Sequence, residues 1–190
     1  MRCVACEKLS FSLICKSCQE HYFAPVFNKR ELSKDFFVYS FYDYDVIKEL
    51  LNSKYEFYGD RIYNILASLS FATFAKNFEF IGMVDAIAID DHTRHDFSHT
   101  AILTKHLKSN YITPKMNLLK AKNQIKYAGK TLEFRKKNPR NFVYSGEKGR
   151  DVILVDDIVT TGTTLLEAKR CLEHNGCNVL FSLTLSDAKN

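Results

Sequence analysis

The chain has 190 residues, of which 46% are hydrophobic and 26% are charged, and it contains only three prolines. This composition is typical of a globular protein and excludes a chain that is mainly disordered. The length suits one α/β domain with a small additional module, and it excludes two large domains. The formal net charge of +5 is by itself only a weak indication of an anionic partner.

No segment of the sequence approaches the roughly 20 consecutive apolar residues that a membrane-spanning helix needs. The first residues also lack the apolar core of a secretory signal. We therefore expect a cytoplasmic protein, and peripheral attachment to the inner face of a membrane stays open.

Four of the six cysteines lie near the start of the chain as two Cys-x2-Cys pairs. In a reducing compartment this spacing favours a zinc site, and four thiolates leave no open coordination position, so we expect a structural Zn2+. Two disulfides or free buried thiols are the alternative. The expected ligands are Cys3, Cys6, Cys15 and Cys18. We assign residues 1–34 to a zinc finger with its connector and residues 35–190 to the main domain.

The middle of the chain alternates between strand and helix patterns. Residues 35–45 are rich in aromatic side chains and predict a strand or a hairpin, and residues 83–90 predict a short buried strand. Between them, residues 47–54 and 59–76 carry apolar residues at helical spacing. This alternation indicates an α/β fold in which helices flank a parallel sheet.

Three histidines follow the strand expected at residues 83–90, at spacings that are compatible with one helix: His92, His95 and His99. Two interpretations stay open, a metal site and the polar start of a helix near a ligand pocket. The second is favoured because Asp96 is the only acidic side chain among them that matches as a ligand.

The sequence DVILVDDIVTTGTTLLE, residues 151–167, has the pattern of a strand, a loop and a helix. Its apolar part, residues 152–155, predicts a central strand that is buried on both faces. We expect a turn at residues 158–162, a helix at residues 163–176 and another strand at residues 178–186. Open α/β sheets bind ligands at the carboxyl ends of their strands, which makes this loop the candidate site.

The loop has the composition of an uncharged phosphate site. Gly162 lets the backbone approach an anion closely, and the first amides and the dipole of the helix favour its negative charge. Hydroxyl donors come from Thr160, Thr161, Thr163 and Thr164. Asp156 and Asp157 are acceptors for the two hydroxyls of a vicinal diol, and we expect both at a surface cleft. Together these groups predict a ribose 5-phosphate ligand.

Two other interpretations of the loop are weaker. An aspartate turn followed by a threonine cap does not explain the whole run of acids and threonines. A Walker A loop is excluded because its Gly-Lys-Ser/Thr is missing, and the chain has no Gly-x-Gly-x-x-Gly.

Residues 151–165 closely resemble the signature with which type I phosphoribosyltransferases bind 5-phosphoribosyl 1-diphosphate (PRPP). The shared features are a hydrophobic strand, two acids and a Thr-Gly-Thr loop. The resemblance implies the fold of that family, catalytic carboxylates at Asp156 and Asp157, and Mg2+ bound together with PRPP.

Over nearly its whole length the chain resembles the ComF (ComFC) proteins of bacterial natural competence. The resemblance rests on the four cysteines, on SKYEFYGDRI at residues 53–62, and on a region before the PRPP loop that contains Gln124, Arg135, Asn138 and Phe142. It implies a function in natural transformation, in which the protein handles incoming single-stranded DNA in the cytoplasm, next to the DNA-uptake machinery at the inner membrane.

One segment differs from that family. Where most members have Arg-Gly-Phe-Asn-Gln, this chain has HDFSH at residues 95–99, which keeps Phe97 and loses the arginine and the glycine. In the wider transferase group this segment helps to bind pyrophosphate, and Arg94 is the remaining candidate for that interaction here. Whether the chain transfers phosphoribosyl groups is therefore left open.

A basic segment lies between these motifs, because residues 105–140 contain eleven Lys or Arg and a single acid, Glu133. Such a segment fits a surface that follows a phosphate backbone while bases stack on aromatic rings. The alternative is a solvated lysine face over core aromatics. The candidate DNA-binding residues are Lys120, Lys122, Lys126, Lys130, Arg135, Lys136, Lys137 and Arg140, and the candidate stacking rings are Tyr111, Tyr127, Phe134, Phe142 and Tyr144.

We thus expect a competence protein that binds single-stranded DNA and holds PRPP or a ribose phosphate with Mg2+ on a phosphoribosyltransferase-like domain. An active nucleobase phosphoribosyltransferase and a PRPP-sensing regulator are the alternatives.

Overall fold

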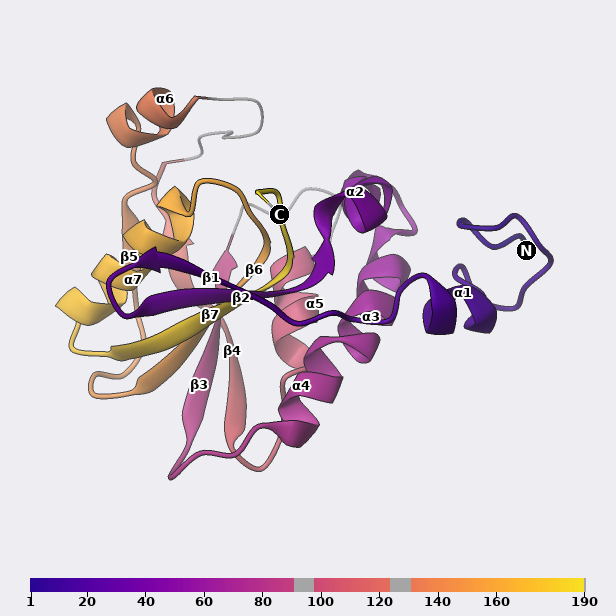
Figure 1. The fold of residues 1–190 in the computed structure, drawn as a ribbon. Coiled ribbons are helices and arrows are strands. Elements are labelled where there is room, and N and C mark those ends of the chain that lie inside the picture. Colours follow the sequence, from indigo (N-terminus) through magenta and orange to yellow (C-terminus); the bar gives the residue numbers. More distant parts are fainter. Residues whose placement is uncertain (91–97, 124–130, 190) are drawn as a thin grey trace.

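The computed structural model describes residues 1–90, 98–123 and 131–189. The chain folds around a seven-stranded sheet with the strand order β1-β2-β7-β6-β3-β4-β5 (Figure 1). The five inner strands run parallel, and the two edge strands, β1 and β5, are antiparallel to their neighbours. The strands are β1 (Asn28–Ser33), β2 (Phe36–Asp43), β3 (Val84–Asp90), β4 (Ile112–Ala121), β5 (Phe142–Tyr144), β6 (Asp151–Val159) and β7 (Asn178–Asp187).

Helices cover both faces of this sheet. The helices are α1 (Lys16–His21), α2 (Tyr44–Asn52), the 3-10 turn η1 (Ser53–Tyr55), α3 (Gly59–Leu69), α4 (Phe71–Asn77), α5 (His99–Lys105), α6 (Leu132–Lys137) and α7 (Thr163–His174). Figure 1 shows α3, α4 and α5 on one side of the sheet and α7 on the other. The hydrophobic core is divided accordingly into two clusters of buried side chains, one on each face.

The central strand β6 explains why two layers of helices are needed. Ile153 and Val155 belong to the cluster under α3 and α5, whereas Val152 and Leu154 belong to the cluster under α7, and all four are fully buried. Successive side chains of a strand point to opposite faces, so this uniformly apolar run requires packing on both sides. The expectation of a buried parallel strand at residues 152–155 is confirmed.

The α/β fold with a parallel sheet and flanking helices is also confirmed, and β6, α7 and β7 form the expected strand-helix-strand unit. Two local predictions were wrong. Strand β6 continues through Val159 into the expected turn, because residues 156–159 still pair with β7. The helix expected at residues 59–76 is divided at Ser70, whose hydroxyl donates to the carbonyl of Leu66.

The N-terminal residues lie at one end of the molecule, as Figure 1 shows. Cys3, Ile14 and Cys18 are buried and belong to the larger core cluster. The edge strand β1 lies before residue 34, at which we placed the boundary of the main domain, and it pairs with β2 as part of the main sheet. The part of the chain that the structure describes contains no helix that is long and apolar enough to cross a membrane.

Candidate functional site

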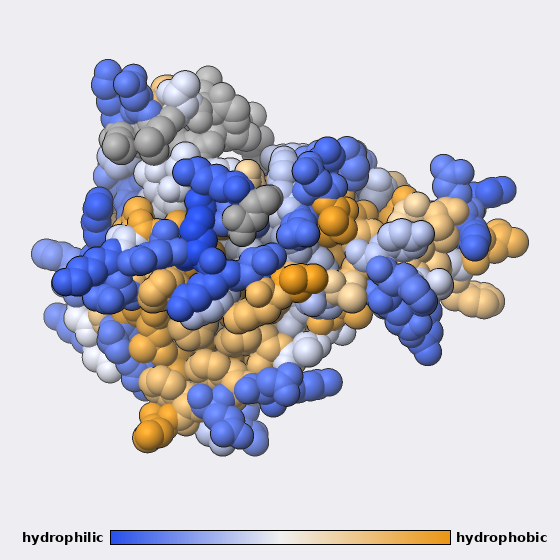
Figure 2. Space-filling model, viewed as in Figure 1, coloured by the Kyte–Doolittle hydropathy of each residue, from blue (hydrophilic) through white to orange (hydrophobic). Residues whose placement is uncertain are grey.

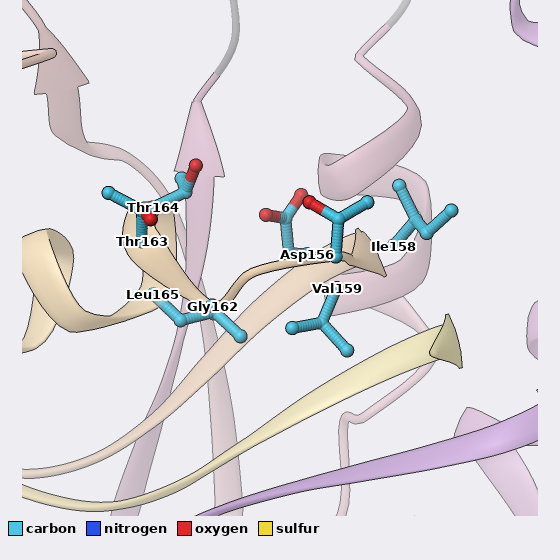
Figure 3. A pocket seen from close by; sticks show the side chains of 8 residues that line it. Asp156, Ile158, Val159, Gly162, Thr163, Thr164 and Leu165 are labelled. Carbon is cyan, nitrogen blue, oxygen red and sulfur yellow. The ribbon is translucent and has the colours of Figure 1, made fainter. Parts of the chain in front are cut away.

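A small, open hollow lies at the carboxyl end of β6, where the chain turns into α7. Its lining residues are Asp156, Ile158, Val159, Thr160, Gly162, Thr163, Thr164 and Leu165. Figure 3 shows the carboxylate of Asp156 and the hydroxyl of Thr164 on the same side of the loop, with the side chain of Val159 pointing the other way. The structure therefore brings together an acceptor carboxylate and the hydroxyl-rich loop.

Gly162 makes the turn into α7 possible. Its φ of 79° lies in the left-handed region, and a Cβ atom placed on it would lie 2.7 Å from Cδ2 of Leu32. The backbone conformation therefore favours glycine, and the side chain of Leu32 on β1 lies close beside it. As the N-cap residue of α7, Gly162 has no side chain with which to cap the helix. The amide of Thr163 donates to Thr161, and the next amides of the first turn, those of Thr164 and Leu165, stay available to a ligand.

The threonine side chains hold the loop together. The hydroxyls of Thr161 and Thr163 lie 2.9 Å apart, and the amide of Thr163 donates to Oγ1 of Thr161 over 3.4 Å. Of the predicted phosphate ligands, Thr160, Gly162, Thr163 and Thr164 line the hollow. An anion in this hollow meets amides, hydroxyls and the positive end of the helix dipole.

The two adjacent carboxylates point in different directions. Asp157 is two and four residues after Val155 and Ile153, so its side chain points to the same face of the sheet, which α3 and α5 cover. Only 4% of Asp157 is exposed, and its Oδ2 lies 2.8 Å from Nζ of Lys54. The expectation that both carboxylates lie at a surface cleft is therefore wrong for Asp157.

A polar cluster surrounds Asp157 on that buried face. Besides Lys54, the Tyr63 hydroxyl donates to Oδ2 of Asp157 over 3.4 Å, and Nε2 of His99 lies 3.5 Å from the same oxygen. Burial raises the pKa of Asp157, but the charges of Lys54 and His99 outweigh burial and hold this pKa well below its usual range. Burial lowers the pKa of Lys54, and the carboxylate outweighs this effect and raises it. The Lys54–Asp157 pair is therefore charged at neutral pH.

The sequence did not indicate that Lys54, Tyr63 and Asp157 would meet, because their separations of 103 and 94 residues give no local signal. His99 was considered only as a member of a histidine group. His92 and His95, like Arg94, lie outside the described residues. The sequence did predict the strand at residues 83–90 and the loop after β6. These two features indicated which end of the sheet carries the candidate site.

The basic segment forms parts of β4 and α6. Lys120, Lys122 and Lys137 are exposed, whereas only 8% of Arg140 is exposed, with its backbone amide bonded to Glu167. Lys126 and Lys130 lie outside the described residues, as do the side chains of Arg135 and Lys136. Figure 2 shows a small group of hydrophilic side chains at this end of the molecule.

The aromatic residues of this segment mostly serve the core. Phe142 and Tyr144 are each 9% exposed and belong to the cluster under α7, and Tyr111 packs against the other cluster. Their rings are not available for stacking on bases. Phe134 is partly exposed, and Tyr127 lies outside the described residues.

The four N-terminal cysteines form a second candidate site. The sulfur atoms of Cys3, Cys6, Cys15 and Cys18 all lie within 4.8 Å of one another. The sulfurs of Cys6 and Cys15 are 3.7 Å apart, close to the edge of about 3.8 Å that Zn–S bonds of about 2.3 Å give in a tetrahedron. This arrangement fits a tetrahedral metal ion.

The electrostatics of the cysteine cluster also favour a thiolate. Burial raises the pKa of Cys3, but hydrogen bonds from the backbone amides of Cys15, Cys6 and Ala5 outweigh burial and lower this pKa to about 6. Burial and the three other thiols raise the pKa of Cys18 to about 12. A divalent cation at the centre of the cluster stabilises all four thiolates.

Comparisons with known proteins agree with this geometry. Residues 123–189 match the family model described as the phosphoribosyl transferase domain. The match covers 67 of the 190 residues and so concerns this segment of the chain. The matched segment contains the loop and α7, so the motif and the family model agree on the same part of the chain.

Individual relatives are similar over shorter stretches. A hypoxanthine-guanine phosphoribosyltransferase of Lactococcus lactis subsp. lactis (strain IL1403) is 56% identical over 40 residues, which are 21% of this chain and 21% of that protein. The chain thus matches about a fifth of the curated relative's length. A hypoxanthine phosphoribosyltransferase structure from Staphylococcus aureus has 16% identity and a TM-score of 0.40, over 67% of this chain and 64% of that chain. A second crystal form gives the same identity and TM-score.

The opposite directions of the two carboxylates lead to a stability prediction. Replacing Asp157 by asparagine (D157N) leaves Lys54 largely buried without a counter-charge, so we expect the free energy of unfolding at pH 7 to fall by about 3 kcal/mol. The matched control D156N, at the hollow, should change it by less than about 1 kcal/mol. Urea denaturation measures the free energy of unfolding of both variants. Equal losses in D157N and D156N would contradict the conclusion that only Asp157 lies in a buried ion pair.

The same pair has a predicted pH dependence. The pKa of Asp157 is lowered in the folded state, so its contribution to stability is complete above its unfolded pKa of about 4 and is lost as the pH falls below that value. The stability difference between the wild type and D157N should therefore narrow in acid. A difference that stays constant down to about pH 2 would show that the charge of Asp157 is not its cause.

The cysteine cluster gives a metal prediction. We expect the purified chain to carry one zinc ion, and Cys18→Ser to lower the metal content by more than half because it removes a thiolate from a closed site. Cys171→Ser, outside the cluster, is the matched control and should keep the zinc. Elemental analysis by mass spectrometry measures the content, and a C18S variant with wild-type zinc would refute the site.

Proposed function

We propose that the loop between β6 and α7 binds the 5-phosphate of PRPP or of a ribose 5-phosphate, with Asp156 at the ribose hydroxyls. The observation that carries the proposal is the hollow itself, in which a carboxylate and an uncapped helix start share one surface. The loop offers donors to the phosphate, and Asp156 offers acceptors to a diol. Among the residues that the structure describes, no lysine or arginine lines this hollow, so the helix dipole, amides and hydroxyls supply the attraction.

The proposed ligand fits a magnesium ion at Asp156. Mg2+ is commonly held by one or two carboxylates together with substrate phosphate oxygens, and Asp156 is a carboxylate in the hollow. When bound, the ion neutralises charge on the diphosphate. Asp157 is not proposed as a second ligand to the diol, because it is paired with Lys54 on the other face of the sheet.

Two outcomes follow for chemistry at this site. Transfer to a nucleobase requires a group that stabilises the departing diphosphate, and the residues considered for it, including Arg94, lie outside the described part of the chain. An active nucleobase phosphoribosyltransferase is the second candidate function, and the short match to the Lactococcus lactis enzyme supports it. Binding without turnover instead gives a PRPP-sensing protein.

Calorimetry with PRPP and Mg2+ tests the proposed site. We expect wild-type binding, and a loss of at least tenfold in affinity for D156N, because the diol loses its charged acceptor. Thr164→Val keeps the shape and removes one hydroxyl, and it should cost several-fold in affinity.

The exposed Asp45→Asn carries the same change of charge away from the hollow and serves as the control. Wild-type affinity in D156N would refute the placement of the ribose. Release of diphosphate upon addition of a nucleobase separates the transferase from the sensor.

We further propose that the basic segment binds single-stranded DNA, as the resemblance to the ComF family implies for a protein of DNA uptake. The exposed Lys120 and Lys122 lie at the end of β4, and Lys137 lies on α6. Since Phe142 and Tyr144 are core residues, phosphate contacts dominate over base stacking. Such binding has little base preference and depends strongly on salt.

Charge reversal tests the DNA surface. In the triple variant Lys120→Glu, Lys122→Glu, Lys137→Glu, we expect the slope of log affinity against log salt to become shallower by about 2, since each lost phosphate contact removes about 0.7 for a single strand. Fluorescence anisotropy with a labelled oligonucleotide measures the slope.

Three exposed lysines outside the segment provide the control with the same net charge, namely Lys34, Lys48 and Lys76. Equal slopes for the two triple variants would show that the attraction is not localised to the basic segment. An absence of binding by the wild type at low salt would remove the DNA proposal altogether.

A further inference from the structure

The edge strand β1 contacts the phosphate loop from outside the hollow. Nη2 of Arg30 donates to the carbonyl oxygen of Thr160 over 2.9 Å, although 130 residues separate them in the sequence. Two residues further along β1, Leu32 lies directly under Gly162. Two points of β1 therefore contact the loop that carries the proposed phosphate site.

Arg30 is itself held in place by a buried carboxylate. Its Nε lies 2.6 Å from Oδ2 of Asp187, whose side chain is only 2% exposed, and 19% of the Arg30 side chain is exposed. Asp187 ends β7 and lies opposite Val159 in the sheet register, and its Oδ1 accepts from the amide of Lys189. The guanidinium thus joins the end of β7 to the first residue of the loop.

The planar guanidinium is suited to this double contact. Its nitrogens lie in one plane, and Nε forms an ion pair with Asp187 without hydrogen-bond geometry while Nη2 donates to the carbonyl of Thr160. In a trans peptide the carbonyl and the following amide point in opposite directions. Fixing the Thr160 carbonyl toward Arg30 therefore fixes the Thr161 amide on the opposite side of the same peptide plane.

We propose that Arg30 is a positioning residue of the phosphate loop: it orients the peptide between Thr160 and Thr161 so that the loop is preorganised for the 5-phosphate. The inference rests on the proposed PRPP site and extends it to the edge strand. Arg30 contacts the carbonyl of the loop and not the proposed ligand, so its effect passes through the backbone. A preorganised loop gains affinity because it loses less conformational freedom on binding.

The experiment compares Arg30→Lys and Arg30→Ala with the wild type. R30K keeps a positive charge beside Asp187 but loses the Nη2 donor that bonds to the carbonyl of Thr160. We therefore expect the variant to fold and its loop to be less well ordered. We expect its affinity for PRPP-Mg2+ to fall about tenfold, and its affinity for ribose 5-phosphate to fall by the same factor because both ligands carry the 5-phosphate. R30A also leaves Asp187 without its partner, so its thermal stability is measured in parallel.

Lys29→Ala is the matched control, because it removes one positive charge from the exposed face of the same strand. It should change affinity less than twofold. A merely structural arginine would lower the melting temperature in R30K without changing either affinity at temperatures well below the transition, and that result would overturn the proposal.

Hydrogen exchange of the amides at residues 160–164 gives a second readout that needs no ligand. We expect faster exchange in R30K than in the wild type and in K29A. If the wild type binds neither PRPP nor ribose 5-phosphate, the proposed function fails, and exchange then decides alone whether Arg30 orders the loop. Unchanged exchange in R30K would refute that ordering.

Discussion

The strict alternation of side chains along β6 is the constraint on which the site depends. The strand is buried on both faces up to Val155, so the next two residues must continue to opposite sides of the sheet. Asp156 emerges at the hollow and Asp157 enters the space beneath α3 and α5. Two adjacent residues of the same type thus lie in different environments, Asp156 at an open hollow and Asp157 in a buried ion pair.

The charged residues behind the loop follow from the same geometry. Asp157 is nearly inaccessible to water and is stable as an anion because Lys54 and His99 lie beside it. Asp187 is equally buried at the end of β7, and Arg30 pairs with it. Each carboxylate lies near the end of an inner strand and forms an ion pair with a cation from a distant part of the sequence. These pairs connect η1 and β1 to the strands on either side of the proposed site.

The sequence was informative where the signal is local. Residues 152–155 predicted a doubly buried strand, and the residues around Gly162 predicted a turn into a helix, because these features depend on neighbours within a few residues. The contacts of Arg30 with Thr160 and of Lys54 with Asp157 join residues more than 100 positions apart. Neither β1 nor η1 has a residue pattern that predicts a contact with a residue so far away in the sequence. The aromatic residues Phe142 and Tyr144 illustrate the same limit, since composition alone does not separate a core ring from a stacking ring.

The pairing of Lys54 and Arg30 with buried carboxylates also bears on selectivity. A phosphate site built from free cations attracts any polyanion, and its affinity falls steeply with salt. Here both cations are largely neutralised by Asp157 and Asp187, and the hollow is lined by hydroxyls, an uncapped helix start and one carboxylate. The carboxylate of Asp156 repels a continuous phosphate backbone but accepts hydroxyls from a ribose. The hollow is therefore chemically distinct from the exposed lysines of β4 and α6, and we propose the two as separate surfaces for a sugar phosphate and for a DNA strand.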